Sequence, residues 1–549
     1  MKKLLLLFSV FMITNLKAQI VLDTLSSRYI GPGVLYSDII ARSVPWTIKV
    51  LRVDLKNKNI SMEAVKAKES YFGYERTSVM SKRRNYDGHQ VVGAINADYY
   101  NTSNGSITNI QIGNGQIYRG PVKSSLIGFD INNKPMIDIC SLDAKVFSGG
   151  QSLKINEVNQ SRGANQLILY NFYKGTSTGT DTSGNEALIR PLSNWLVNDT
   201  IKCVIESMEN GKGNMTIPSG KAILSANGSA ASFIADNFHV GDTVKLYMGI
   251  TTSLKKIKEL VGGHPRLVNN GVNYLETALK FEPGSSTTTR EPRSAAGISQ
   301  DSTYLYLITL DGRQTSSAGA TLSEFADLLI KLGVYHGFNL DGGGSTTMVA
   351  RNEVMNSPSD GNERSVSNCL LVVSSAPFKP DSLKRFAFTY KYDKFQIYSV
   401  DRIKLSVYAN DVNDNPSQID SSSLSFSLSN GLGVVDNSGM FTASKLQKSG
   451  YIYTKYKGFT DSTLISIIPV TKIVMLPKTS TIDATTPLKL SLKGYTAGNT
   501  ERTLQYEDLQ WSVSDTSVVS ITKDGQVLGK KEGKVKIVTT FLNGISDSI

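Results

Sequence analysis

The chain has 549 residues, of which 40% are hydrophobic and 19% are charged, and its formal net charge is +12. This length exceeds one core at roughly 100–200 residues per domain, and the composition excludes wholesale disorder. The basic residues are spread out rather than gathered in a stripe with aromatic residues, so no nucleic-acid partner is expected. Only three cysteines occur, without CxxC spacing, which excludes a thiolate zinc site.

The N-terminus has the pattern of a secretory signal peptide. Two lysines precede an apolar run at residues 4–16, and the small residue Ala18 offers a cleavage point. The run is too short to span a bilayer comfortably, and no later segment reaches about 18 consecutive apolar residues. We therefore predict a signal peptide over residues 1–18, no transmembrane segment, and a secreted, periplasmic or cell-surface protein.

Several apolar segments end in polar residues beside glycine. The stretch "VVGAINADYY" places Asn96 and Asp98 on one strand face, and "GGHPR" places His264 in a glycine turn. Arg293 begins the apolar segment of "EPRSAAGIS". The next apolar segment, "YLYLITLDGRQ", ends in Asp311, Gly312 and Arg313.

A helix is predicted over residues 321–333. Thr321 and Glu324 have the spacing of a capping box, and apolar residues recur at helical spacing up to Gly333. Glu324 is therefore interpreted as part of a cap rather than as a catalytic group.

The segment "FNLDGGGSTTMV", residues 338–349, places Asn339 and Asp341 on one strand face before three glycines and Ser345. Successive N–H groups in a glycine turn can bind an anion, but the lysine of a P-loop is absent. The alternative is a plain tight turn. With four histidines in the chain, a Ser–His–Asp triad is poorly supported.

After residues 374–382 the pattern changes to short alternating strands separated by Asn, Asp, Gly and Ser. We predict two tandem Ig-like modules at 377–469 and 470–549, the second similar to the bacterial Ig-like repeat and apparently cut short. The stretch "DVNDNPSQID", residues 411–420, lacks the Gly and Glu of an EF-hand and is interpreted as an inter-strand turn. Residues 377–549 are expected to be dispensable for chemistry.

The polar segments, in this order, resemble the phosphodiester glycosidase family over roughly residues 30–373. One family histidine is Glu291 here. The resemblance implies a catalytic domain over 19–376. This domain would cleave a sugar-1-phosphodiester linkage like that of N-acetylglucosamine-1-phosphodiester. It implies catalytic roles for Asp341, Asp311, Asn96 and Arg293. Substrate-binding roles fall on Asn339, Gly342, Gly343, Gly344, Ser345, Arg313, Asp98, Arg364, Asn368 and His264.

The expected fold is an α+β catalytic domain, with a mixed sheet and flanking helices, followed by two all-β Ig-like sandwich modules. Two carboxylates on a sugar are the usual glycosidase arrangement, and Ca²⁺ is an open option as a cofactor. The expected partners are a glycan or sugar-phosphate substrate and a cell-surface polymer held by the modules. The alternative function is a non-catalytic protein that binds a cell-surface glycan or wall polymer.

Overall fold

The structure is a computed structural model that describes residues 20–252, 254–282 and 287–549. The predicted signal peptide over 1–18 lies outside the described residues. Strands make up 48% of the chain and helices 9%. The described residues contain four α-helices: α1 (Thr77–Arg83), α2 (Ser229–Asn237), α3 (Leu275–Ala278) and α4 (Leu322–Lys331).

The predicted α+β catalytic domain with flanking helices is therefore wrong. Many sheets are present, one of them a nearly closed barrel, and the two sheets at the centre share one apolar core. The strands β6, β22 and β28 are buried at every position. Such strands lack the alternation that marks a half-exposed sheet, so the sequence does not reveal what covers them.

Two sheets carry Asn96, Arg293, Asn339 and Asn368 in their strands, and a shared apolar core that includes Leu51, Ile95 and Phe338 lies between them. The first has eight strands in the order β1 (Leu22–Gly31), β2 (Val34–Ala41), β3 (Trp46–Asp54), β23 (Tyr304–Leu310), β22 (Arg293–Ile298), β24 (His336–Asn339), β20 (Arg266–Asn269) and β21 (Val272–Asn273). The second has five strands: β26 (Glu353–Val354), β25 (Met348–Ala350), β6 (Gln90–Asn96), β28 (Asn368–Ser374) and β4 (Ile60–Lys66).

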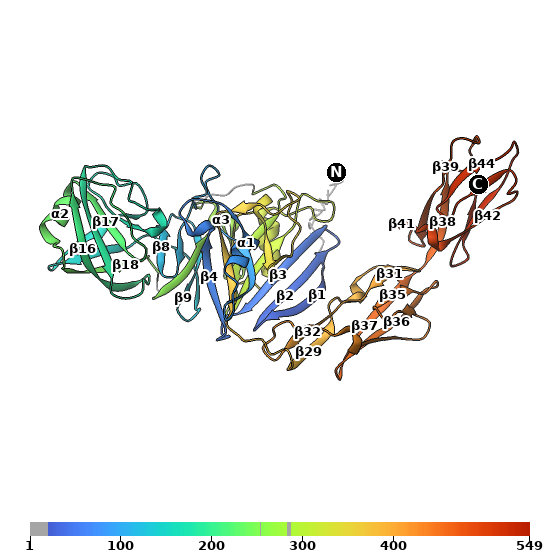
Figure 1. Cartoon of the computed structure of the whole chain (residues 1–549), viewed down its shortest axis with the longest axis horizontal. Helices are drawn as coiled ribbons and strands as arrows, with labels where there is room; N and C mark the ends of the chain where they lie inside the picture. Colours follow the sequence, from blue (N-terminus) through green and yellow to red (C-terminus); the bar gives the residue numbers. More distant parts are fainter. Residues whose placement is uncertain (1–19, 253, 283–286) are drawn as a thin grey trace, which may run out of the picture.

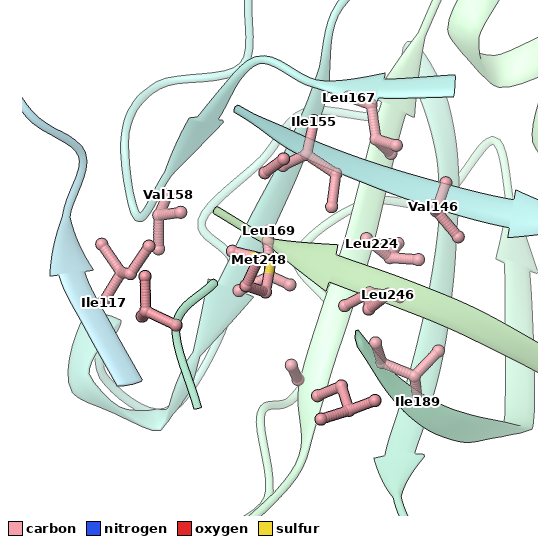
Figure 2. Close-up of a cluster of buried hydrophobic side chains, with 14 of the residues drawn as sticks. Ile117, Val146, Ile155, Val158, Leu167, Leu169, Ile189, Leu224, Leu246 and Met248 are labelled. Carbon is pink, nitrogen blue, oxygen red and sulfur yellow. The ribbon is translucent and has the colours of Figure 1, made fainter. Parts of the chain in front are cut away.

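An inserted sheet forms the end of the molecule drawn in green in Figure 1. Figure 2 shows its apolar interior, where Val146, Leu224 and Leu246 gather. Its order is β12 (Gln151–Ile155), β11 (Ala144–Ser148), β18 (Thr243–Met248), β16 (Asp199–Asn210), β15 (Gly184–Pro191), β17 (Ala222–Asn227), β14 (Leu167–Asn171) and β13 (Glu157–Val158). A five-stranded sheet adjoins it: β10 (Pro135–Ile139), β9 (Ser125–Asp130), β19 (Ile257–Gly262), β7 (Gln111–Gly113) and β8 (Gln116–Arg119).

The C-terminal part, from β29 onwards, has strands and single-turn 3₁₀ helices but no α-helix among its described residues. Figure 1 shows two successive strand units there, each with its own apolar core. Their Ig-like identity stays a prediction. The first unit contains β29 (Leu383–Phe388), β30 (Ile397–Tyr398), β31 (Arg402–Lys404), β32 (Val407–Asp411), β33 (Leu424–Leu428), β34 (Gly433–Val435), β35 (Met440–Ala443), β36 (Lys448–Tyr456) and β37 (Phe459–Ile468). The second contains β38 (Val470–Leu476), β39 (Leu488–Lys489), β40 (Ser491–Thr496), β41 (Glu501–Thr503), β42 (Leu509–Val513), β43 (Val519–Ile521), β44 (Gln526–Gly529), β45 (Ile537–Phe541) and β46 (Ser546–Ser548).

The three cysteines form no disulfide within the described residues. Cys140, Cys203 and Cys369 are free and buried. Within the part of the chain that the structure describes, no helix combines the length and apolarity needed to cross a membrane. The helix predicted over 321–333 is confirmed as α4, and both hydrogen bonds of its capping box, between Thr321 and Glu324, are present.

We expect Thr321→Ala to lower the stability of the unit that contains α4 by about 1 kcal/mol, because an N-cap hydroxyl satisfies an otherwise unpaired backbone donor. Thr321→Ser keeps the hydroxyl and should match the wild type. Thermal unfolding followed by circular dichroism measures both variants. Equal midpoints for Thr321→Ala and Thr321→Ser would show that the cap contributes nothing.

Candidate functional site

The site lies where the ends of strands from the two central sheets meet. Asn96 ends β6 in one sheet, and Ser294 lies in β22 of the other. The Ser294 hydroxyl donates to Asn96 Oδ1 at 2.8 Å. Asn96 Nδ2 donates to the Asp341 carbonyl at 2.6 Å, and the Thr347 N–H donates to Asn96 Oδ1 at 3.0 Å. One side-chain amide therefore joins both sheets to the two ends of segment 341–347.

These bonds favour a positioning role for Asn96. Its side chain is fully buried, and both ends of its amide are used by protein groups. The Asp341 N–H donates to the Ala97 carbonyl at 2.8 Å, so the Asp341 backbone is held on both sides. Asn96 thus fixes the backbone of Asp341, which is a partly exposed residue.

Asp341 has the electrostatic character of a functional carboxylate. Burial raises its pKa to about 6, while the Ser345 hydroxyl and the Arg364 charge act in the opposite direction. The residue nevertheless keeps part of its surface exposed. A carboxyl group with a pKa this close to neutral can hold or release a proton under physiological conditions.

The predicted glycine nest is closed by the protein itself. The Gly343 N–H donates to the Pro292 carbonyl, and the N–H groups of Ser345 and Thr346 close the turn on Gly342 and Gly343. Glycine is required here for space and conformation. Gly343 has a φ of +60°, and a Cβ on Gly344 would lie 2.1 Å from Arg364 Nη2. Gly343 and Gly344 therefore let the Arg313 and Arg364 side chains approach the backbone, whereas Gly342 leaves room for the Pro292 carbonyl.

Asp98 is a buried second carboxylate near Asp341. Its oxygens accept from the Asn109 side chain at 2.6 Å and the Asn109 N–H at 3.0 Å. Its own N–H donates to Asn368 Oδ1 at 2.9 Å. Burial raises the pKa of Asp98 to about 7, the bonds from Asn109 lower it, and the Asp341 charge raises it further. The Asn368 side chain thus fixes the backbone of Asp98.

Asp311 has a different environment from the one expected for the partner of Asp341. Its carboxylate accepts from the Ser357 N–H at 3.1 Å and from Asn356 Nδ2 at 3.3 Å. Burial raises its pKa to about 6, and the nearby charges that act on it are Lys49 and Asp38. Asn356 also donates to the Thr346 carbonyl at 2.9 Å. In this structure Asp311 therefore fastens the loop that supports segment 341–347.

Tyr99 is a site residue that the sequence reasoning did not select, although its position directly after Asp98 was a signal. Its hydroxyl accepts from Asn339 Nδ2 at 2.7 Å, and its ring stacks on His264 at 4.3 Å between centroids. Burial raises its pKa, Asp341 raises it further and Arg293 lowers it. Asn339 Oδ1 is buried and has no hydrogen-bond partner among the described residues. Tyr99 thus lies among the predicted groups.

The three predicted arginines differ in exposure. Arg293 is 3% exposed, and its guanidinium donates to the carbonyls of Ala320 and Thr289. Arg313 pairs with Glu291 at 2.6 Å, and Arg364 pairs with Asp360 at 2.6 Å. The last two side chains are nearly half exposed beside the glycines. They, rather than Arg293, present guanidinium groups to solvent.

Calcium binding stays a prediction. Among residues 20–252, 254–282 and 287–549, no group of three or more His, Cys, Asp or Glu side chains has an arrangement that could hold a metal ion.

Residues 196–373 match the family model described as phosphodiester glycosidase. The match covers less than half of the chain. It includes the segment from His264 to Asn368 but leaves out Asn96 and Asp98.

Three known proteins are similar to the chain. A prophage-derived uncharacterized protein, YomE, of Bacillus subtilis is 39% identical over 83 residues, which is 15% of this chain and 13% of that protein. A hypothetical protein from Synechocystis is 21% identical with a TM-score of 0.48 and 62% of each chain covered. The catalytic domain of zebrafish N-acetylglucosamine-1-phosphodiester alpha-N-acetylglucosaminidase is 15% identical with a TM-score of 0.33, covering 65% of this chain and 84% of that one. The chain thus spans less than two thirds of the first two proteins.

The raised pKa of Asp98 predicts a pH dependence of stability. The folded protein binds this proton more tightly than the unfolded chain, whose Asp has a pKa of 3.8. The stabilisation is complete below about pH 4 and is lost as pH rises through about 7. Asp98→Asn removes the ionisation, so its unfolding midpoint should fall less between pH 4 and 7. Parallel midpoint curves for the variant and the wild type would contradict the raised pKa.

Proposed function

We propose that this chain, whose residues 196–373 indicate a glycosidase-type hydrolase, cleaves the bond between a sugar and a phosphodiester. The substrate class is a sugar-1-phosphodiester, with an N-acetylglucosamine-1-phosphodiester-like linkage as the first example. The observation that carries this proposal is the setting of Asp341. Its backbone is held on both sides, and burial raises the pKa of its carboxyl group beside Arg364.

The cationic side chains fit the phosphodiester part of such a substrate. Arg364 and Arg313 flank the glycine turn with nearly half-exposed guanidinium groups. Planar guanidinium groups bind phosphate oxygens in a bidentate manner. In the proposal these two arginines hold the phosphodiester next to Asp341. Their acidic partners, Glu291 and Asp360, keep both side chains in place until the substrate competes for them.

The polar groups around Tyr99 fit the sugar part. The Tyr99 hydroxyl accepts from Asn339, so its own proton remains available to a sugar oxygen. Asn339 Oδ1 offers a buried acceptor to a sugar hydroxyl. The stacked ring of His264 holds Tyr99 in this orientation. These contacts would place the anomeric carbon near Asp341.

Asp341 and Asp98 are the proposed carboxyl pair, in place of Asp341 and Asp311. In the proposal Asp341 faces the substrate and exchanges the proton at the scissile bond, because Asp341 is a partly exposed residue and Asp98 is not. Asp98 is 1% exposed and is not proposed to contact the substrate. It acts on Asp341 electrostatically, since a negative charge on one carboxyl group disfavours ionisation of the other. Hydrolysis adds water across the bond and yields the free sugar and a phosphomonoester.

Secretion and polymer binding belong to the same proposal. A signal peptide over residues 1–18 would deliver the protein to the periplasm, the cell surface or the medium, where sugar phosphodiesters occur in surface polymers. The two C-terminal units would hold the enzyme near such a polymer.

Asp341→Asn should lower kcat about 10²–10⁴-fold, because a carboxyl group that transfers a proton is replaced by an amide of the same shape. The substrate is a methyl diester of α-N-acetylglucosamine-1-phosphate, and released sugar is measured. Asp436→Asn, in the C-terminal part, is the matched control and should retain wild-type turnover.

Near-normal turnover by Asp341→Asn would remove Asp341 from the mechanism. Binding of the diester by the wild type without release of sugar would instead support the alternative, a non-catalytic glycan or wall-polymer binding protein.

A further inference from the structure

The first C-terminal unit lies against an edge of the domain that holds the site. Strand β1 is the edge strand of the eight-stranded sheet. The Lys391 N–H donates to the Leu25 carbonyl of β1 at 2.7 Å, and Asn410 Nδ2 donates to the Tyr29 carbonyl at 3.0 Å. The Arg385 guanidinium lies 4.4 Å from the centre of the Tyr29 ring. The unit thus covers an edge that would otherwise expose unpaired backbone groups.

Arg351 is the residue that joins three parts of the structure at this contact. Its guanidinium donates to the Ile30 carbonyl of β1 at 2.5 Å and to Gln90 Oε1 of β6 at 2.9 Å. It donates a third bond, at 2.8 Å, to Asn415 Oδ1 of the first C-terminal unit, and it lies 5.6 Å from the ring centre of Phe378. One planar cation therefore links both central sheets to the C-terminal unit.

Asn415, the acceptor in the first C-terminal unit, is held in place by hydrogen bonds that do not involve Arg351. Asp411 Oδ1 accepts from the N–H groups of Asn413 and Asn415, and the Asp411 N–H donates to the Asn415 carbonyl. Asn415 Nδ2 donates to the Pro377 carbonyl at 3.2 Å. Asn415 is fully buried. The asparagine-rich stretch at 411–415 is thus an ordered loop that presents one amide oxygen.

Arg351 follows the site segment directly. The three-residue strand β25 begins at Met348, next to Thr347, and ends at Ala350. Its residues pair with β6 up to Ile95, the neighbour of Asn96. Segment 341–350 is therefore held near its start by Asn96 and just beyond its end by Arg351. A short strand with few ladder bonds depends on such end contacts.

We propose that loop 411–415 of the first C-terminal unit is part of the catalytic unit, and that Arg351 is a positioning residue which fixes segment 341–350 through Asn415. This reverses the expectation that residues 377–549 are dispensable for chemistry. The consequence for turnover rests on the proposed function, but the positioning itself does not.

The hydrogen bonds of the Arg351 guanidinium explain why loss of the Asn415 acceptor should affect segment 341–350. All three oxygens that Arg351 contacts are neutral, and burial lowers the pKa of Arg351 to about 10, while the Asp411 charge acts in the opposite direction. Loss of one acceptor leaves a buried cationic donor unsatisfied. Lysine cannot replace arginine, because a single ammonium group lacks the planar fork that reaches three separate acceptors.

Amide hydrogen exchange of the full-length protein, measured by mass spectrometry, tests the proposal without substrate. In Asn415→Ala we expect exchange over residues 346–351 to become about tenfold faster, while β28 is unchanged. Asn415→Asp keeps the acceptor oxygen for Arg351 and loses the bond to the Pro377 carbonyl, so it should raise exchange over residues 346–351 less than Asn415→Ala does. Arg351→Lys should behave like Asn415→Ala.

The matched control is Arg402→Gln, which breaks the ion pair to Asp508 between the two C-terminal units at 2.7 Å. It should leave residues 346–351 protected. Unchanged exchange there in Asn415→Ala, or an equal increase in β28, would overturn the proposal. On the diester substrate, Asn415→Ala should lower kcat several-fold with KM unchanged. If Asn415→Ala had wild-type exchange over residues 346–351 but a low kcat, the positioning role would be wrong. If exchange in Asn415→Ala became faster but the wild type did not hydrolyse the diester, only the proposed function would be wrong.

Discussion

The candidate site depends on the side-chain amide of Asn96. A buried amide needs partners for both its nitrogen and its oxygen; here Asn96 Nδ2 donates to the Asp341 carbonyl, and Asn96 Oδ1 accepts from the Ser294 hydroxyl and the Thr347 N–H. Asn96 lies in the five-stranded sheet, Ser294 lies in the eight-stranded sheet, and Asp341 and Thr347 lie in the segment between the two sheets. Loss of Asn96 would leave several buried polar groups unpaired at once, so the relative position of the sheets and of Asp341 is fixed together.

The same constraint explains how a carboxyl group with a raised pKa can stay ordered. Desolvation of a carboxylate is costly, and Asp98 and Asp341 both undergo it within one site. The cost is tolerated because Asn109 satisfies the oxygens of Asp98 and the backbone of Asp341 is tied at both sides. Local destabilisation of this kind is typical of functional sites. The buried strands around the site and the contact with Arg351 supply the compensating rigidity.

Sequence reasoning identified the local features correctly where one segment determines them. The capping box of Thr321 and Glu324 and the strand that ends at Asn339 depend on neighbouring residues only. Sequence reasoning could not identify features that depend on contacts between residues far apart in the chain. The fold class was wrong because residues far apart in the sequence decide how the strands join into sheets and how the sheets pack, and no pattern within β6 or β22 records this. The catalytic role of Asp311 stays a prediction, and its contact with Asn356, which lies 45 residues away, could not be read from the sequence. The contact between Arg351 and Asn415 is likewise invisible to local patterns.

The central claim is that Asn96 holds Asp341 in its working position, and Asn96→Asp tests it most directly. The change keeps the size of the side chain but replaces the donor to the Asp341 carbonyl with an acceptor. The measurement is steady-state hydrolysis of the α-N-acetylglucosamine-1-phosphate diester, with circular dichroism to confirm folding. The account predicts a folded protein whose kcat falls at least about tenfold, as expected for loss of a buried hydrogen bond that positions a reacting group. A folded variant with wild-type kcat would contradict it.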